Sequence, residues 1–144
     1  MSQRSTLGVF DSGVGGLTVL REIIGRNRYE KIIYLGDTGR VPYGTRSAEK
    51  IKEYAGEDIS FLLRQGADEI VAACGTVSAV ALDTLRESHP DVHIEGVIDA
   101  TVAGAERATK NGRIGVIGTA ATVRSGVYQR RLGDKFRVTA EACP

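Results

Sequence analysis

A chain of 144 residues, 42% hydrophobic and 26% charged, is long enough for one domain with a substantial core and too short for two full-sized domains. Lys and Arg total 19 and Asp and Glu total 18, so the net charge of +1 gives no electrostatic reason to expect nucleic acid or an anionic membrane as a partner. Every apolar run is also shorter than a membrane span.

Strand-like and helix-like segments alternate along the chain, without an internal repeat or a low-complexity segment. In chain order the pattern predicts a strand over 7–10, a helix over 17–24, a strand over 31–35, a helix over 47–65, a strand over 69–73, a helix over 76–88, a strand over 93–98, a helix from 99, a strand over 113–117, a helix over 123–132 and a strand over 136–140. Such alternation is typical of parallel strands joined by right-handed crossovers. The expected fold is α/β, with an open, mostly parallel sheet in flavodoxin-like order and helices on both faces.

The helices carry start signals and apolar faces. Ser47 and Thr76 are the expected caps of the second and third helices, and Asp99 starts the fourth. The positions expected to face inward are Leu17, Leu20 and Ile24 in the first helix, Ile51, Ile59, Phe61, Leu62 and Leu63 in the second, and Val102, Ala105 and Ala108 in the fourth.

The most polar and glycine-rich segments of the chain follow the predicted strands. They are Asp11-Ser12, residues 36–44, Cys74-Gly75-Thr76, Asp99 and residues 118–122. In an open parallel sheet, ligands bind beyond the carboxyl ends of the strands, near the switch in strand order. The sequence therefore predicts a small-molecule site at this edge.

Cys74 ends an apolar run and precedes a helix. A thiol at a helix N-terminus lies near positive partial charge and unpaired N–H groups, which stabilise its thiolate. A thiolate there acts as a nucleophile or as a general base. The alternative is that Cys74 is a small buried apolar residue, the most common state of a free cysteine. Position alone does not separate the two interpretations.

Asp11 and Ser12 end the first strand. A carboxylate at this point can orient an ammonium group, accept a proton, hold a metal ion or cap a helix, and capping is as good an interpretation as catalysis. The following run, Gly13 to Gly16, resembles a phosphate-cradling loop but lacks the Lys-Ser/Thr ending of a P-loop.

The loop over 36–46 is too long for a simple connector and contains Pro42, Tyr43 and Gly44. We expect the backbone N–H groups at Gly44 to suit a carboxylate and Tyr43 to hydrogen-bond to a ligand or wall the pocket, with a plain turn as the alternative. Three hydroxyls lie at predicted helix starts, those of Thr76, Thr119 and Thr122. Helix capping is the first interpretation for each of them, and contact with a ligand is a second one.

Two cysteines far apart do not form the disulfide framework of a small secreted domain, so a reducing, cytoplasmic setting is expected. The N-terminal residues lead straight into a strand pattern, and we expect no secretory signal. A zinc site is not expected, because the cysteines, His89 and His93 show no ligand spacing. Cys143 and the two histidines are assigned no role.

Four segments carry a more specific signal: residues 8–19 (Gly-Val-Phe-Asp-Ser-Gly-Val-Gly-Gly-Leu-Thr-Val), residues 36–46 (Gly-Asp-Thr-Gly-Arg-Val-Pro-Tyr-Gly-Thr-Arg), Ala73-Cys-Gly-Thr76 and residues 115–119 (Gly-Val-Ile-Gly-Thr). In this order they resemble the N-terminal domain of the glutamate racemases, in the aspartate/glutamate racemase superfamily. The resemblance covers nearly the whole chain.

The resemblance implies interconversion of L- and D-glutamate without a cofactor or a metal ion, which supplies D-glutamate for peptidoglycan. The family uses two cysteines on opposite faces of the substrate: one removes the α-proton as a thiolate and the other delivers a proton to the far face. By this resemblance Cys74 is the first cysteine, while Asp11 and Ser12 contact the amino-acid head group and support proton transfer. The other matching residues are expected to bind carboxylates or line the pocket: Pro42, Tyr43, Gly44, Thr76, Thr119 and Thr122.

The chain departs from the family pattern in two places. Many members have Asn where Gly75 stands, so a side-chain donor to the substrate is replaced here by a backbone N–H or a water molecule. The family also continues into a second, similar domain that holds the second cysteine in a Gly-Cys-Thr-His motif, which Cys143 does not match. We therefore expect residues 1–144 to be the N-terminal domain, with weak or no racemase activity alone.

Three alternatives stay open. The first is that the chain is a dicarboxylate-binding domain, and the second is that it is an inactive fragment. The third is that it is part of a related racemase or decarboxylase that acts on aspartate or another α-carboxylate. A homodimer that brings two copies of Cys74 face to face is a further hypothesis.

Overall fold

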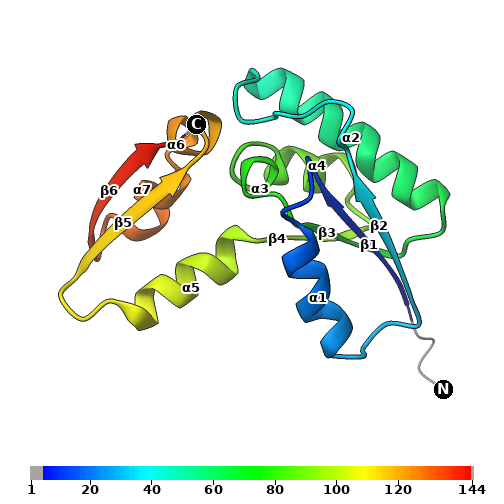
Figure 1. Cartoon of the computed structure of the whole chain (residues 1–144), viewed down its shortest axis with the longest axis horizontal. Helices are drawn as coiled ribbons and strands as arrows, with labels where there is room; N and C mark the ends of the chain where they lie inside the picture. Colours follow the sequence, from blue (N-terminus) through cyan, green and yellow to red (C-terminus); the bar gives the residue numbers. More distant parts are fainter. Residues whose placement is uncertain (1–4, 144) are drawn as a thin grey trace.

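Strands and helices alternate throughout residues 5–143, the part of the chain that the computed structural model describes (Figure 1). In chain order the elements are β1 (Thr6–Asp11), α1 (Leu17–Gly25), β2 (Lys31–Gly36), α2 (Ala48–Arg64), β3 (Glu69–Ala72), α3 (Gly75–Val80), α4 (Leu82–Ser88), β4 (His93–Gly96), α5 (Ile98–Ala108), β5 (Arg113–Gly118), α6 (Ala120–Ser125), α7 (Val127–Leu132) and β6 (Arg137–Ala142). Each predicted strand is present, and every strand pair is parallel, which confirms the α/β class.

The first four strands form one sheet in the order β2-β1-β3-β4, which agrees with the flavodoxin-like order expected for them. Helices cover both of its faces. Phe10 and Ile70 pack with apolar residues of α2, α3 and α4 on one face. Leu7 and Val9 pack on the other face, against residues of α1 such as Leu20. Two-sided burial of this kind is what an all-parallel sheet requires.

The expectation of a single sheet is wrong for the last two strands, because β5 pairs with β6 in a separate two-stranded sheet. Figure 1 shows this sheet beside the first one, with α5 running between the two. Ile114 and Val138 pack with residues of helices α5 and α7, whereas Ile117 on the opposite face is 78% exposed. The local apolar pattern of a strand predicts the strand itself but does not select its partner, which is set by contacts distant in sequence.

Some predicted helix faces are also wrong. In α1, Leu17 and Ile24 are exposed, and the helix turns Leu20 and Ile23 toward the sheet. In α2, Phe61 is 40% exposed, whereas the predicted positions Ile51, Ile59 and Leu62 are buried. In α5, Val102 is buried and Ala105 packs with it, but Ala108 is exposed. Short helices with apolar residues on more than one face do not define their inward side by spacing alone.

The predicted helix over 76–88 divides into α3 and α4 at Ala81, whose φ of −117° bends the chain while i→i+4 hydrogen bonds continue on both sides. Its N-cap is Cys74 and not Thr76. The predicted helix over 123–132 begins earlier, at Ala120, and divides into α6 and α7 at Gly126, where φ is +65° and glycine is favoured. The fourth strand ends at Gly96, because Ile98 already belongs to α5.

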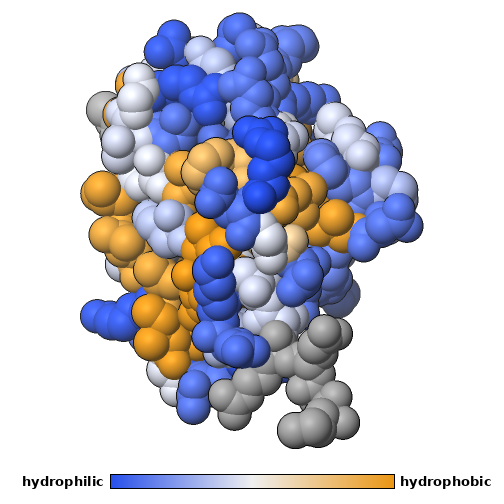
Figure 2. All heavy atoms as spheres, turned by 90° about the vertical axis from the view of Figure 1, so that its right-hand side faces the viewer, coloured by the Kyte–Doolittle hydropathy of each residue, from blue (hydrophilic) through white to orange (hydrophobic). Residues whose placement is uncertain are grey.

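One expected cap holds: the side chain of Ser47 accepts a hydrogen bond from the Lys50 N–H at the start of α2. Asp99, expected to start the fourth helix, lies in the first turn of α5, whose N-cap is Val97. Within residues 5–143, no helix has the length and apolar character needed to cross a bilayer. Figure 2 shows apolar surface interrupted by hydrophilic residues on the face that includes the β2 edge of the sheet.

Candidate active site

The ends of β1 and β3 bring three of the predicted site residues together. These strands are neighbours, and the Ala73 N–H donates to Phe10 O, so Asp11 and Cys74 leave the sheet at the same level. The Sγ atom of Cys74 lies 3.4 Å from the Oγ atom of Ser12, within hydrogen-bonding distance for sulfur. The sheet therefore sets a thiol, a hydroxyl and a carboxylate side by side.

The electrostatics of Cys74 differ from the expectation at a helix N-terminus. The side chain is 4% exposed, and burial raises the pKa of its thiol, while the hydrogen bond with Ser12 lowers that pKa and the charge of Asp11 raises it again. The net direction is upward, because α3 is only six residues long and desolvation of a buried thiolate outweighs its N-terminal N–H groups. In this structure the thiol is the favoured form at neutral pH.

Asp11 is buried, and its Oδ2 atom accepts a hydrogen bond of 2.9 Å from the Gly16 N–H. The carboxylate therefore shapes the turn before α1, although the N-cap of that helix is Gly16 itself. This turn has a further support that the sequence did not reveal. The hydroxyl of Tyr34 on β2 lies 3.4 Å from Gly13 O, and burial followed by the charges of Asp11 and Cys74 raises the Tyr34 pKa.

The loop over 36–46 makes contacts with both the four-stranded sheet and helix α6, which lies next to the β5–β6 sheet. The Asp37 N–H donates to Asp11 O at 2.9 Å, which attaches the start of the loop to the end of β1. At its other end, Gly44 O accepts a hydrogen bond of 3.0 Å from the Ala121 N–H of α6. Gly44 packs so closely that a Cβ atom there would lie 2.5 Å from the Cβ atom of Thr119. Pro42 is exposed and follows a cis peptide bond.

The predicted ligand-facing role of the Tyr43 side chain is wrong. Tyr43 is 1% exposed, and its hydroxyl contacts the carboxylates of Asp37 and Asp58 beneath the loop. The side chain thus anchors the turn from beneath. Arg40 and Asp58 also belong to this anchor, and the sequence analysis missed both, because a charged residue in an amphipathic helix or loop has the pattern of a surface residue.

The three predicted threonine hydroxyls form a continuous row. Thr119 Oγ1 lies 2.9 Å from Thr76 Oγ1 and 2.9 Å from Thr122 Oγ1. Thr119 also caps α6, since its side chain accepts from the Thr122 N–H. The row joins α3 of the first sheet to α6 of the second, and it lies directly beside Gly44. Gly75, between Cys74 and Thr76, is exposed, and a Cβ atom there would meet nothing within 4 Å.

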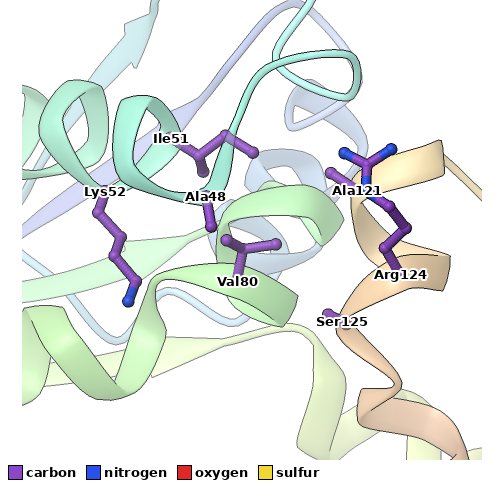
Figure 3. A pocket seen from close by; sticks show the side chains of 7 residues that line it. All are labelled: Ala48, Ile51, Lys52, Val80, Ala121, Arg124 and Ser125. Atoms are coloured by element: carbon purple, nitrogen blue, oxygen red, sulfur yellow. The ribbon is translucent and has the colours of Figure 1, made fainter.

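Two other features lie outside this cluster. Asp99 follows the end of β4, is half exposed and pairs with Arg131 at 2.6 Å. A cavity of about 280 Å³ between α2, α3 and α6 contains none of the predicted site residues (Figure 3). Its lining consists of Ala48, Ile51, Lys52, Val80, Ala121, Arg124 and Ser125.

Cys143 is exposed and extends the β5–β6 pairing through its N–H, which donates to Gly118 O. No group of three or more His, Cys, Asp or Glu side chains within residues 5–143 is arranged to hold a metal ion. The chemically distinctive arrangement is therefore the row from Asp11 and Ser12 to Cys74, flanked by the threonine hydroxyls. It combines a thiol and a hydroxyl with a carboxylate, and the causes of the shift in the Cys74 pKa include the Asp11 charge and the Ser12 hydrogen bond.

Comparison with known proteins gives a consistent picture. The family model for Asp/Glu/Hydantoin racemase matches residues 19–143. The chain is 46% identical to the glutamate racemase of Chlorobaculum parvum, over 100% of this chain and 54% of that protein. Among solved structures, it resembles the glutamate racemase of Aquifex pyrophilus with 51% identity and a TM-score of 0.91, over 96% of this chain and 55% of the other.

A second solved structure, the glutamate racemase of Francisella tularensis in complex with D-glutamate, has 35% identity and a TM-score of 0.88, over 97% of this chain and 53% of that one. The chain thus spans about half the length of the curated relatives it matches.

Proposed function

Because the chain belongs to the Asp/Glu/Hydantoin racemase family, we propose that it provides one half of the active site of a glutamate racemase, which interconverts L- and D-glutamate. The observation that carries the proposal is the contact between the buried Cys74 thiol and Ser12, with the Asp11 carboxylate beside them. In this proposal the reaction uses groups of the protein itself, without a cofactor, and it supplies D-glutamate for peptidoglycan in the cytoplasm.

The first step is binding of the amino-acid head group. Asp11 is a buried acidic group, so the ammonium group of the substrate has a partner there, and Ser12 adds a hydroxyl. The positively charged ammonium group of the substrate, next to Cys74, also lowers the pKa of the thiol, since an opposite charge nearby favours the thiolate. Substrate binding and activation of the base are coupled in this way.

The second step is proton transfer. The thiolate of Cys74 takes the α-proton, the electron pair of the broken C–H bond stays on the substrate as a carbanion, and a proton delivered to the opposite face completes the inversion. The developing negative charge needs fixed donors in a dry site. We assign this role to the backbone N–H groups of Tyr43, Gly44 and Gly75, and to the hydroxyls of Thr76, Thr119 and Thr122.

The opposite face of the substrate needs its own acid, and Cys143 does not supply it, because it is exposed at the end of β6. We propose that the N-terminal racemase domain formed by this chain acts with a second domain that carries the second cysteine. A homodimer that places two copies of Cys74 face to face is the alternative source.

The test follows hydrogen at the α-carbon of L-glutamate in deuterated water, by NMR, with the pure 144-residue chain. We expect exchange at the α-position with little inversion, and loss of exchange in Cys74→Ala. Cys143→Ala is the matched control and keeps the wild-type rate. Exchange that survives Cys74→Ala contradicts the mechanism, and tight glutamate binding without any exchange indicates a dicarboxylate-binding domain instead.

The same experiment with aspartate tests the substrate. Faster exchange with aspartate than with glutamate assigns the chain to the related racemases. Inversion that grows with the square of the protein concentration indicates the homodimer.

A further inference from the structure

Four side chains, two of them buried and two partly buried, form a cluster beneath the turn that contains Pro42. Asp37, Arg40 and Tyr43 come from the loop over 36–46, and Asp58 comes from α2; we call them the loop cluster. Arg40 donates from Nε to Asp37 at 2.6 Å and from Nη2 to Asp58 Oδ1 at 2.9 Å. The hydroxyl oxygen of Tyr43 contacts Asp37 Oδ2 and lies 3.0 Å from Asp58 Oδ2.

Tyr43 has one hydroxyl proton, which is not enough to form hydrogen bonds with both Asp37 and Asp58. Burial and the two neighbouring carboxyl groups raise the Tyr43 pKa, so the phenol is neutral and carries one proton. That proton can be donated to one carboxylate oxygen only, yet two such oxygens lie against the same hydroxyl. Both contacts are hydrogen bonds when one of the two aspartates is protonated and donates to the Tyr43 oxygen.

Of the two aspartates, Asp58 is more readily protonated than Asp37. Its side chain is 3% exposed against 13% for Asp37, so its charged form has less access to water. One guanidinium, that of Arg40, faces two buried carboxyl groups, which leaves one negative charge without a buried partner if both are ionised. Burial and the charge of Asp37 raise the Asp58 pKa to about 6, although Tyr43 and Arg40 act in the opposite direction.

The other charged groups around the cluster lie on α2 and do not remove this imbalance. Glu57 also accepts from Arg40 and adds a negative charge, but its side chain is 59% exposed. Arg40 stacks 4.3 Å from the ring centre of Tyr54, and Lys50 lies on the same ring while it pairs with Glu53.

We propose that Asp58 is a positioning residue that, in its protonated form, donates a hydrogen bond to Tyr43, which donates in turn to Asp37, and that this chain of three oxygen atoms fixes the turn over residues 42–44. The turn then has three fixed points. Asp37 holds its start to Asp11, the Tyr43 hydroxyl holds its centre to α2, and Gly44 holds its end to Thr119 and Ala121.

The role of the turn toward a substrate carboxylate rests on the proposed function, whereas the shared proton does not. Asparagine at position 58 imitates the protonated acid, because its amide N–H donates to Tyr43 and its carbonyl accepts from Arg40. Alanine removes both bonds. The pair Asp58→Asn and Asp58→Ala therefore separates a neutral donor from an ionised carboxylate.

The experiment measures amide hydrogen exchange of the whole chain by NMR at about pH 5, below the Asp58 pKa of about 6, with β1 and β3 amides as the internal reference. We expect Asp58→Asn to keep the protection of residues 37–46, and Asp58→Ala or Tyr43→Phe to lower it about tenfold, the effect of one lost buried hydrogen bond. Asp91→Asn, at an exposed aspartate, is the control. Loosening in Asp58→Asn equal to that in Asp58→Ala overturns the proposal, because it shows that the charge is required.

A second measurement needs no variant that risks misfolding. The carboxyl ¹³C signal of Asp58, assigned by its loss in Asp58→Asn, is followed with pH in the wild-type chain. A midpoint above the ordinary aspartate range supports the neutral acid, and an ordinary midpoint overturns it.

Glutamate affinity completes the test. We expect Asp58→Asn to leave the Kd for glutamate unchanged and Asp58→Ala to raise it, under conditions in which both variants are folded. If the wild-type chain does not bind glutamate, the proposed function fails, while the exchange and titration results still decide the role of Asp58.

Discussion

The four-stranded sheet and the β5–β6 sheet contain the same kind of parallel strand but differ in how their faces are covered. Helices pack on both faces of the first, and its central residues, such as Phe10 and Ile70, are fully buried. The second has helices α5 and α7 on one face only, and Ile117 on the other is 78% exposed. The stability of the chain therefore resides mainly in its first part, while the candidate site draws on both.

The largest expected difference compares the same substitution in the two parts. Ile59→Ala removes a fully buried side chain of α2 and is expected to lower the free energy of unfolding by about 2–5 kcal/mol. Ile117→Ala removes an exposed side chain of β5, and we expect a cost of about 1 kcal/mol or less, from strand propensity alone. Urea unfolding of both variants measures the contrast. Equal costs would mean that the exposed face of β5 is covered in solution.

The junction between the two parts is tested with a pair of glycines. Gly44→Ala places a Cβ atom 2.5 Å from the Thr119 Cβ atom, and we expect this overpacking to cost about 1–3 kcal/mol. Gly75→Ala meets nothing within 4 Å and serves as the control, with a change below about 0.5 kcal/mol. Thermal unfolding gives both values. A harmless Gly44→Ala would show that α6 moves freely against the loop.

The two thiols give a third contrast. Burial raises the pKa of Cys74 in the first part, whereas Cys143 in the second is exposed. At neutral pH we expect an alkylating reagent to modify Cys143 at least about tenfold faster, since the thiolate is the reactive form. Mass spectrometry of the modified peptides over a pH series measures both rates. Ser12→Ala should slow Cys74 further, because its hydrogen bond lowers the pKa; faster reaction would contradict this geometry.

The smallest expected effect is the pH dependence contributed by Asp58. Its pKa is raised from 3.8 to about 6 on folding, so between these values the folded chain binds more protons than the unfolded chain. The contribution of this group to stability is therefore greatest at the acidic end of the window and is lost as the pH rises through about 6. The Tm of wild type minus that of Asp58→Asn should fall across this range; a flat difference contradicts the raised pKa.

The comparison also shows what the sequence reveals and what it does not. The strands and the Ser47 cap are local features, and their residue patterns predicted them. The separation of β5 from β4 is a choice between distant partners, and nothing in the run from Arg113 to Ile117 indicates it. Likewise, the breaks at Ala81 and Gly126 depend on how short helices pack.

The candidate site was predictable to a similar degree. Strand ends and motif resemblance correctly gathered Asp11, Ser12 and Cys74, because parallel strands place their carboxyl ends at one edge. The direction of the Tyr43 side chain was not predictable, since it depends on Asp58 from another element. The same holds for the Cys74 pKa, because a helix start and burial act in opposite directions and only the structure gives their balance.

The order β2-β1-β3-β4 has a consequence for how the chain folds during its synthesis. All four strands and the helices that cover them lie before residue 97, so this part is complete in sequence before β5 has been made. The segments that carry Asp11 and Cys74 are therefore both available for pairing before β5 exists. The contact of Gly44 with Thr119 becomes possible only once α6 has been made.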